Sequence, residues 1–434
     1  MRVGGGMSWR TLAGSVSWFL LVSLAGCGER TLSDSPETLV EHARERLDAG
    51  DPAGAEADAA RALSLGLEAA RGVRAEALVA QARFDEAAQD LDRLIAAHPN
   101  QAKWYRLRAR VRIEQGNLID AANDVQRAIT LAPGDPEGYR LRARVAQAAG
   151  RLTDALADLD RVLGQRRDTD TLVLRGDLRL ETGNLAGARA DYEAARKLGA
   201  AGGTRGLAKT LVVEGKYRQA AELAEQAARQ APDVPENHAV HARAVALAGN
   251  LEEARKAWDR GAESAPDAVC IRSGRGVFTL ITGDHHVARE DFNTLLQSGE
   301  RVPYAMLWLL LVDLEQGAAR DEVAQNALAF MEQLGIPLEG GGADGTGEAS
   351  RYAPIFRFLA GRISADQMLE QVPQAWHDPA AYRSLAAFFA GYLDMKQGNS
   401  TGARARFQET VAARQRLAME FWAAGLLMNR LAAR

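Results

Sequence analysis

The feature that most constrains the fold of this chain is a glycine that returns at a nearly constant interval of about 34 residues. The regular part of the series comprises Gly116, Gly150, Gly183, Gly215, Gly249, Gly283 and Gly317. Most of these glycines are followed five residues later by an alanine, as Gly116 is by Ala121. One short unit written many times predicts a stacked array rather than the two or three globular domains that 434 residues would otherwise suggest.

The regular spacing fits a unit made of two helices. The glycine allows a tight turn between them, and the alanine lets them approach closely. A larger residue further on, such as Tyr192, Trp258 or Phe292, is expected to fill the space to the next unit. Prolines close several units, at Pro99, Pro133, Pro232 and Pro266. This pattern resembles the tetratricopeptide repeat (TPR), which implies an all-α, right-handed superhelical solenoid of about ten helix-turn-helix repeats.

Composition agrees with a helical array and excludes several other classes. Helix formers are abundant, whereas aromatic residues make up only 6% of the chain, so an all-β fold is excluded. Two cysteines, Cys27 and Cys270, cannot build a disulfide scaffold. A net charge of −4 argues against general nucleic-acid binding.

The repeat register predicts the organisation of the chain. Nine repeats are expected over residues 36–336, at about 36–67, 68–101, 102–135, 136–168, 169–200, 201–234, 235–268, 269–302 and 303–336. A glycine-rich linker is expected at 337–352 and C-terminal helices at 353–434. These helices include a short one capped by Ser364, a further repeat at 384–417 and a capping helix at 418–433.

The segment 1–27 predicts a secretory signal peptide, followed by a short tether at 28–35. Basic residues, an apolar stretch too short to span a bilayer and a final Leu24-Ala25-Gly26-Cys27 follow one another. The last four residues resemble a bacterial lipobox, which implies that Cys27 carries acyl groups such as palmitate. Gly28 at the next position favours the outer membrane, facing the periplasm, in lipoproteins of this kind. A plain signal peptide with a chance cysteine, and a true start at Met7, remain open.

The tail carries a narrower resemblance. The segments "PIFRFLAGRIS" and "FFAGYLDMKQGNSTGARARFQETV", with a final helix, are similar to the C-terminal part of the NlpI-type periplasmic lipoproteins. The resemblance implies partners among peptidoglycan hydrolases or a protease that degrades them.

The sequence contains no catalytic or metal-binding motif, so we expect no enzyme, cofactor or metal site. His238 and His241 share a helix face but fall where the two helices of a repeat pack, which favours a structural pair. His285-His286 is expected in solvent, and Cys270 is expected to act as a small apolar residue. An acidic series is expected on a solvated face: Asp154, Asp158 and Asp160.

Candidate partner-binding residues come from the helix positions that line the groove in TPR proteins. Several repeats place cations there: Arg106, Arg110, Arg140, Arg144, Arg205, Lys209 and Arg243. Guanidinium groups on a rigid surface suit bidentate recognition of carboxylates, although they could equally pair with acidic residues of neighbouring helices. Later repeats place apolar residues at these positions, namely Tyr304, Leu307 and Leu311. These could hold apolar side chains of a partner, or the tail after residue 353 could cover them.

Together these observations predict a non-enzymatic, lipid-anchored scaffold that binds protein partners in the bacterial cell envelope. The alternative is a pilotin-like or exopolysaccharide-export lipoprotein that helps to assemble an envelope-spanning machine. We expect protein partners to bind in the groove and the N-terminal lipid to contact a membrane. We expect no binding of nucleic acid.

Overall fold

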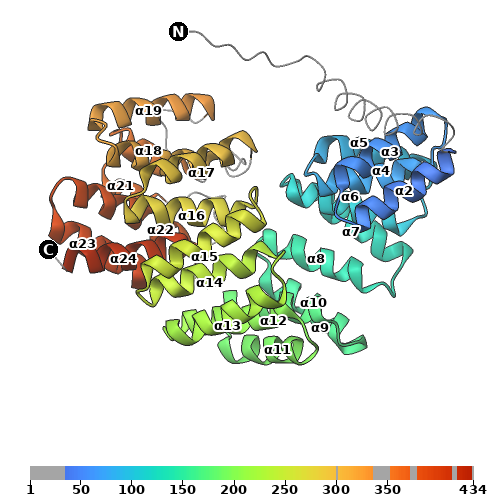
Figure 1. Ribbon diagram of the computed structural model, residues 1–434, viewed down its shortest axis with the longest axis horizontal. Helices are drawn as coiled ribbons and strands as arrows, with labels where there is room; N and C mark the ends of the chain where they lie inside the picture. Colours follow the sequence, from blue (N-terminus) through green and yellow to red (C-terminus); the bar gives the residue numbers. More distant parts are fainter. Residues whose placement is uncertain (1–34, 300–301, 336–351, 372–378, 413–417, 433–434) are drawn as a thin grey trace, which may run out of the picture. The chain divides into compact units, whose positions relative to one another are not determined.

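The computed structural model describes residues 35–299, 302–335, 352–371, 379–412 and 418–432. Within these ranges the chain forms 23 α-helices, α2 to α24, and no strand (Figure 1). The predicted all-helical architecture of stacked repeats is therefore confirmed. The predicted signal peptide with Cys27, nearly all of the tether and nearly all of the glycine-rich linker lie outside the described residues.

The chain divides into two compact units, residues 1–141 and 142–434, with the division inside α8. The helices of the first unit are α2 (Pro36–Asp48), α3 (Pro52–Ser64), α4 (Ala70–Ala80), α5 (Phe84–Ala97), α6 (Ala102–Glu114), α7 (Leu118–Leu131) and the start of α8 (Pro136–Ala148). In the repeats, even-numbered helices are the first of each pair, here called A helices, and odd-numbered ones are the B helices.

The second unit continues the alternation and ends in the tail. Its repeats comprise α9 (Leu152–Gln165), α10 (Thr169–Glu181), α11 (Leu185–Lys197), α12 (Ala201–Val213), α13 (Tyr217–Gln230), α14 (Pro235–Leu247), α15 (Leu251–Ser264), α16 (Val269–Thr282), α17 (His285–Gln297), α18 (Val302–Glu315) and α19 (Arg320–Gln333). The tail comprises α20 (Ala353–Leu359), α21 (Ala365–Glu370), α22 (Pro379–Lys396), α23 (Ser400–Ala412) and α24 (Met419–Ala432). As predicted, Ser364 caps α21, where it forms a capping box with Gln367.

The turn between A and B helices follows from the residues that the sequence repeats. Gly116 has a φ of +74°, a left-handed conformation that glycine adopts without a steric penalty. The next residue, Asn117, caps α7 by accepting a hydrogen bond from the backbone N–H of Asp120 (3.3 Å). In the second repeat Ala82 replaces the glycine and keeps a φ of +56°, so the turn is retained at the cost of backbone strain.

The core confirms the roles expected for small and large residues. Where an alanine stands five residues after the turn, it is fully buried, as Ala121, Ala155, Ala188, Ala220, Ala254 and Ala288 show. Tyr192, Trp258 and Phe292 are also fully buried. A Cβ atom on Gly206 would come within 2.1 Å of the Tyr192 ring, so the glycine lets α12 approach α11 closely.

Candidate partner-binding site

The two candidate cations of α6 have different surroundings. Arg106 is about three-quarters buried and forms an ion pair with Asp135. Arg110, one helical turn further on, is exposed and has no ion pair within the described part of the chain. Of these two residues, Arg110 therefore offers the guanidinium group whose charge no neighbouring carboxylate neutralises.

The same contrast recurs on α8, one repeat later. Arg140 forms an ion pair with Glu137, one turn earlier on the same helix. Arg144, which occupies the position of Arg110 in this next repeat, is exposed and also lacks an ion pair among the described residues. Pairing with neighbouring acidic residues therefore applies to Arg106 and Arg140, whereas Arg110 and Arg144 remain exposed.

A polar cluster surrounds the candidate cations of α12. Lys209 Nζ donates a hydrogen bond to Asp177 Oδ1 at 2.9 Å, and the Tyr192 hydroxyl donates to the same oxygen at 2.7 Å. Burial and the negative charge of Asp177 raise the pKa of Tyr192 far above its usual value, so the hydroxyl stays protonated. Arg205 Nη1 donates to Asn237 Oδ1 at 3.1 Å. The polar groups of this cluster therefore bond to one another. Lys209 is paired with a carboxylate, whereas Arg205 is bonded to a neutral amide.

Arg243 on α14 is half-buried, and its Nε donates to the carbonyl oxygen of Ala239 at 3.1 Å. Burial lowers its pKa, while Cys270 and Tyr304 act in the opposite direction. Arg243 is therefore part of the interior of the second unit rather than an exposed cation.

The apolar candidates are covered, which corrects their assignment to an open groove. Leu307 and Leu311 are fully buried, and Tyr304 is 7% exposed. The cover comes from the tail, because the ring of Trp308, on the same helix, has its centroid 5.2 Å from that of Phe388 on α22. The Tyr304 hydroxyl donates to Met419 Sδ on α24 at 3.2 Å. The tail after residue 353 therefore covers these residues, and they do not line an open groove for a partner. Helix α18 is so apolar that its exposure to water would be unfavourable.

A feature missed in the sequence is a repeated arginine–aspartate pair, here called the Arg–Asp ladder. Its members are Arg74–Asp90, Arg108–Asp124, Arg142–Asp158, Arg175–Asp191 and Arg275–Asp291. In each pair Nε and Nη2 of the A-helix arginine donate to the two oxygens of the B-helix aspartate, at 2.6–3.0 Å. Such bidentate bonds are the strongest geometry for this pair of groups.

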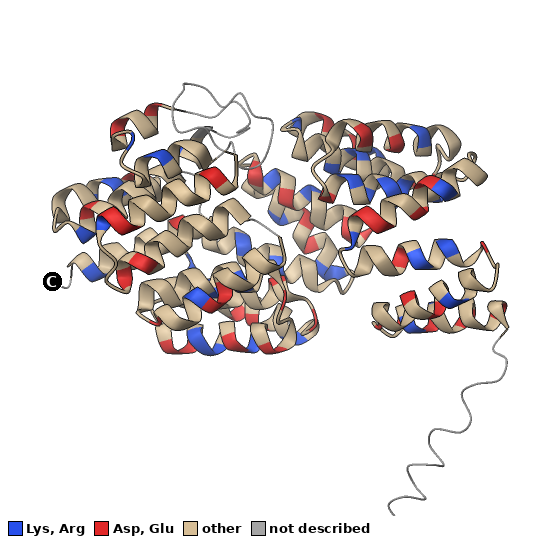
Figure 2. Ribbon diagram, turned by 90° about the horizontal axis from the view of Figure 1, so that it is seen from above, with Lys and Arg blue, Asp and Glu red and all other residues tan. Residues whose placement is uncertain are grey.

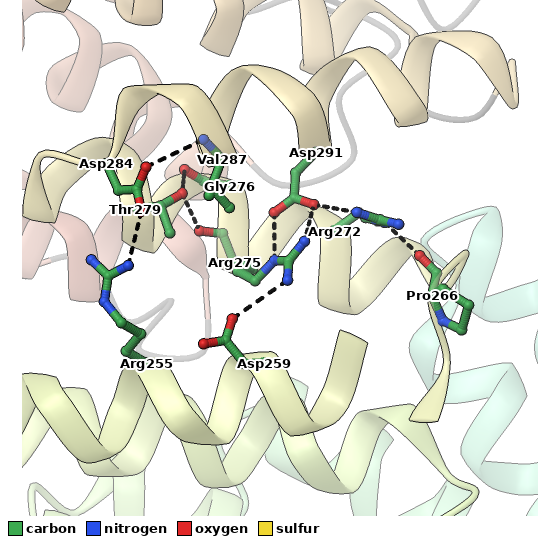
Figure 3. A network of polar contacts seen from close by, with 10 residues as sticks. All are labelled: Arg255, Asp259, Pro266, Arg272, Arg275, Gly276, Thr279, Asp284, Val287 and Asp291. Carbon is green, nitrogen blue, oxygen red and sulfur yellow. Dashed lines mark hydrogen bonds and ion pairs between the residues drawn. The ribbon is translucent and has the colours of Figure 1, made fainter. Parts of the chain in front are cut away.

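Figure 3 shows one pair of the ladder with its neighbours. Asp291 is fully buried and accepts from Arg275 and also from Arg272 Nη1 at 2.7 Å (Figure 3). Arg275 also forms an ion pair with Asp259 of the preceding repeat at 3.4 Å. Hydrogen bonding to Asp291 raises the pKa of Arg275, so its charge is permanent.

The ladder has a signal in the sequence that could have revealed it. Each arginine lies eight residues before the turn residue and each aspartate eight residues after it. The expectation of a solvated acidic face is therefore wrong at Asp158, which is 8% exposed and bonded to Arg142. Asp154 and Asp160 are exposed as expected, although Asp160 also forms an ion pair with Arg175. Charges of both signs are interleaved along the helices, as Figure 2 shows.

The remaining candidates have structural surroundings. His238 and His241 are buried, and His238 Nε2 lies 2.8 Å from the carbonyl oxygen of Pro232. Burial lowers the pKa of His241 and raises that of Cys270 to about 11, so both are neutral near pH 7. His286 is exposed as expected, whereas His285 is half-buried.

Within the described ranges no three His, Cys, Asp or Glu residues are grouped to hold a metal ion, and no helix is long and apolar enough to cross a bilayer.

Comparison with known proteins identifies the repeats. Two sequence profiles of the tetratricopeptide repeat match the chain, one at residues 73–136 and 140–202 and the other at 211–270. These segments are tetratricopeptide repeats. Proteins built from such repeats are generally non-catalytic scaffolds for protein–protein interaction. No curated protein sequence matches the chain.

Several solved structures are similar to the chain at low sequence identity. A tetratricopeptide repeat protein from Parabacteroides merdae is 17% identical, over 64% of this chain and 99% of that one, with a TM-score of 0.42. Yeast Tom70 is 11% identical, over 91% and 96% of the two chains, with a TM-score of 0.40. The human IFIT1 dimer with PPP-AAAA is 15% identical, over 87% and 90%, with a TM-score of 0.49.

Proposed function

We propose that this chain is a lipid-anchored adaptor that uses its A helices to hold acidic segments of envelope proteins. The observation that carries the proposal is the exposure of Arg110 and Arg144 at equivalent positions of consecutive repeats. Guanidinium groups held on rigid helices and lacking an internal carboxylate partner suit the recognition of carboxylates on another protein. The repeats support a scaffold function, and the lipobox resemblance supports anchoring through Cys27.

The first experiment tests the two proposed partner-binding residues. Wild-type, lipidated protein is cross-linked in isolated envelopes, and the bound proteins are identified by mass spectrometry. Binding of the main partner is then measured for Arg110→Glu/Arg144→Glu and for a control with the same change in charge, Arg93→Glu/Arg127→Glu. The control arginines are exposed on the B helices α5 and α7.

We expect the A-helix double variant to weaken partner binding at least tenfold, with an unchanged circular dichroism spectrum, and the B-helix variant to bind as the wild type does. Equal binding by both variants would exclude Arg110 and Arg144 as partner-binding residues. Peptidoglycan hydrolases or their protease among the partners would support the cell-wall function. Components of a secretion or export machine would favour the assembly function instead.

The second experiment tests the anchor separately. We expect Cys27→Ser to abolish incorporation of labelled palmitate and to move the protein from the membrane pellet to the soluble fraction. Retention of the label in this variant would contradict lipidation at Cys27.

A further inference from the structure

One position of the B helix carries an arginine in each repeat of the first unit. The eleventh residue after the turn residue is Arg61 on α3, Arg93 on α5 and Arg127 on α7. In the sequence Arg161 continues this spacing and Ala194 ends it. Because the three helices share one register, these arginines occupy the same face of each. Arg61, Arg93 and Arg127 are here called the B-helix arginine row.

The charge of the row is not neutralised within the first unit. All three arginines are exposed, and none forms an ion pair with another described residue. Every carboxylate on the same three helices is instead bonded to a different side chain: Glu56 and Glu86 to Arg83, Asp58 to Arg46, Asp85 to Gln115, Asp90 to Arg74, Asp92 and Asp124 to Arg108, and Asp120 to Asn117. The row therefore offers three guanidinium groups to an anionic ligand.

The residues beside the row carry no charge. Side chains three or four positions apart lie on the same side of a helix. At these distances from the arginines the exposed residues are small or polar, namely Ala57, Ser64, Gln89, Ala96, Asn123 and Thr130. None of them is aromatic or a large apolar residue of the kind that forms the anchoring pockets of protein interfaces. Amide and hydroxyl groups next to guanidinium groups suit a ligand that carries both carboxylates and hydroxyls.

The form of the row favours a narrow ligand over a broad anionic surface. The side chains of Glu86 and Asp92 on α5 remain 53% and 60% exposed, although both are paired. An anionic bilayer would meet these carboxylates as well as Arg93, and like charges would oppose the contact. A single anionic chain can follow the arginines alone.

We propose that the B-helix arginine row binds a linear acidic polysaccharide, with a carboxylate of the polymer at each arginine. One exposed ion pair contributes little by itself. Three on one polymer reinforce one another, because the second and third contacts form within a complex that already exists. The A helices then hold a protein partner and the B helices a sugar polymer, and the second activity does not depend on the first.

Titration of the full, lipidated chain in detergent with polygalacturonate at low ionic strength tests the proposal. The test variant is Arg61→Gln/Arg93→Gln/Arg127→Gln. The matched control, Arg167→Gln/Arg196→Gln/Arg218→Gln, makes the same change at three exposed arginines outside the row. Neutral dextran and poly-glutamate are the comparison ligands. Calorimetry measures Kd, and thermal unfolding checks that the variants keep the fold of the wild type.

We expect the wild type to bind polygalacturonate, more weakly as salt rises, and not to bind dextran. The row variant should bind polygalacturonate about tenfold more weakly, and the control within about twofold of the wild type. The proposal is overturned if the wild type does not bind polygalacturonate or if both variants weaken binding equally. Tighter binding of poly-glutamate at the row also overturns it, since the ligand would then be an acidic peptide.

The two binding activities can be lost separately. Arg110→Glu/Arg144→Glu should bind polygalacturonate as the wild type does, and the row variant should keep the protein partner. Failure of the row to bind the polymer therefore leaves the proposed adaptor function standing, and the reverse also holds.

Discussion

Helices α6 and α18 occupy the same place in their repeats, yet their surfaces are opposite in character. Helix α6 buries three residues, Leu107, Ala109 and Val111, and carries five lysines and arginines. Helix α18 buries eleven residues and contains no basic residue. One repeat pattern thus supports two surfaces: a charged one that ion pairs and solvent satisfy, and an apolar one that the tail must cover. What packs on the A helices, rather than the repeat itself, determines which parts of them a partner can reach.

The largest effect is expected where the tail covers α18. Trp308 is fully buried and its ring centroid lies within 6.1 Å of those of Phe292, Phe388 and Phe389. We expect Trp308→Ala to lower the free energy of unfolding of the second unit by about 3–5 kcal/mol, because it leaves a large cavity between α18 and α22. Urea unfolding followed by circular dichroism measures the loss. Trp104→Ala on the half-buried face of α6 is the control, and an equal loss there would mean that the two surfaces do not differ as described.

A smaller effect is expected in the Arg–Asp ladder. Asp291→Asn removes the charge that Arg272 and Arg275 share, and leaves both guanidinium groups partly buried beside a neutral amide. Breaking a buried pair in this way should destabilise the second unit by about 3 kcal/mol. Asp259→Asn, at a half-exposed partner of Arg275, should change stability by less than about 0.5 kcal/mol. Thermal unfolding of both variants compares them, and similar shifts in Tm would show that burial of the ladder aspartate does not matter.

The smallest effect is expected at the turn of the second repeat. Ala82→Gly should stabilise the first unit by about 1 kcal/mol, because glycine adopts the φ of +56° without steric cost. Gly116→Ala makes the reverse change one repeat later and should destabilise by a similar amount. Chemical denaturation measures both, and a loss of stability in Ala82→Gly would contradict the strain.

Much of the fold could be predicted from the spacing of residues along the sequence. Which candidate residues of the site are exposed, paired or buried could not be predicted in this way. The turn at Gly116 and the buried contact at Ala121 depend on residues close in sequence, so the repeat spacing predicts both. The pairing of Arg106 with Asp135 and the contact of Tyr304 with Met419 connect residues 29 and 115 positions apart. Neither follows from a repeat period, so the sequence alone could not separate the exposed Arg110 from the paired Arg106. The Arg–Asp ladder was readable in principle, since its spacing is symmetric about the turn.

The ladder also has a consequence for how the array deforms. Arg175 bonds Asp191 in its own repeat and Asp160 in the preceding one, and Arg275 does the same with Asp291 and Asp259. In a repeat protein, ties of this kind raise the coupling between nearest neighbours, so tied repeats unfold and bend as a group. At the equivalent positions between these two arginines the chain has Leu207 with Leu223 and His241 with Ala257. In α12–α15, where the ladder is interrupted, the coupling between one repeat and the next should depend instead on apolar packing and on single contacts such as Lys209 with Asp177 and Arg205 with Asn237.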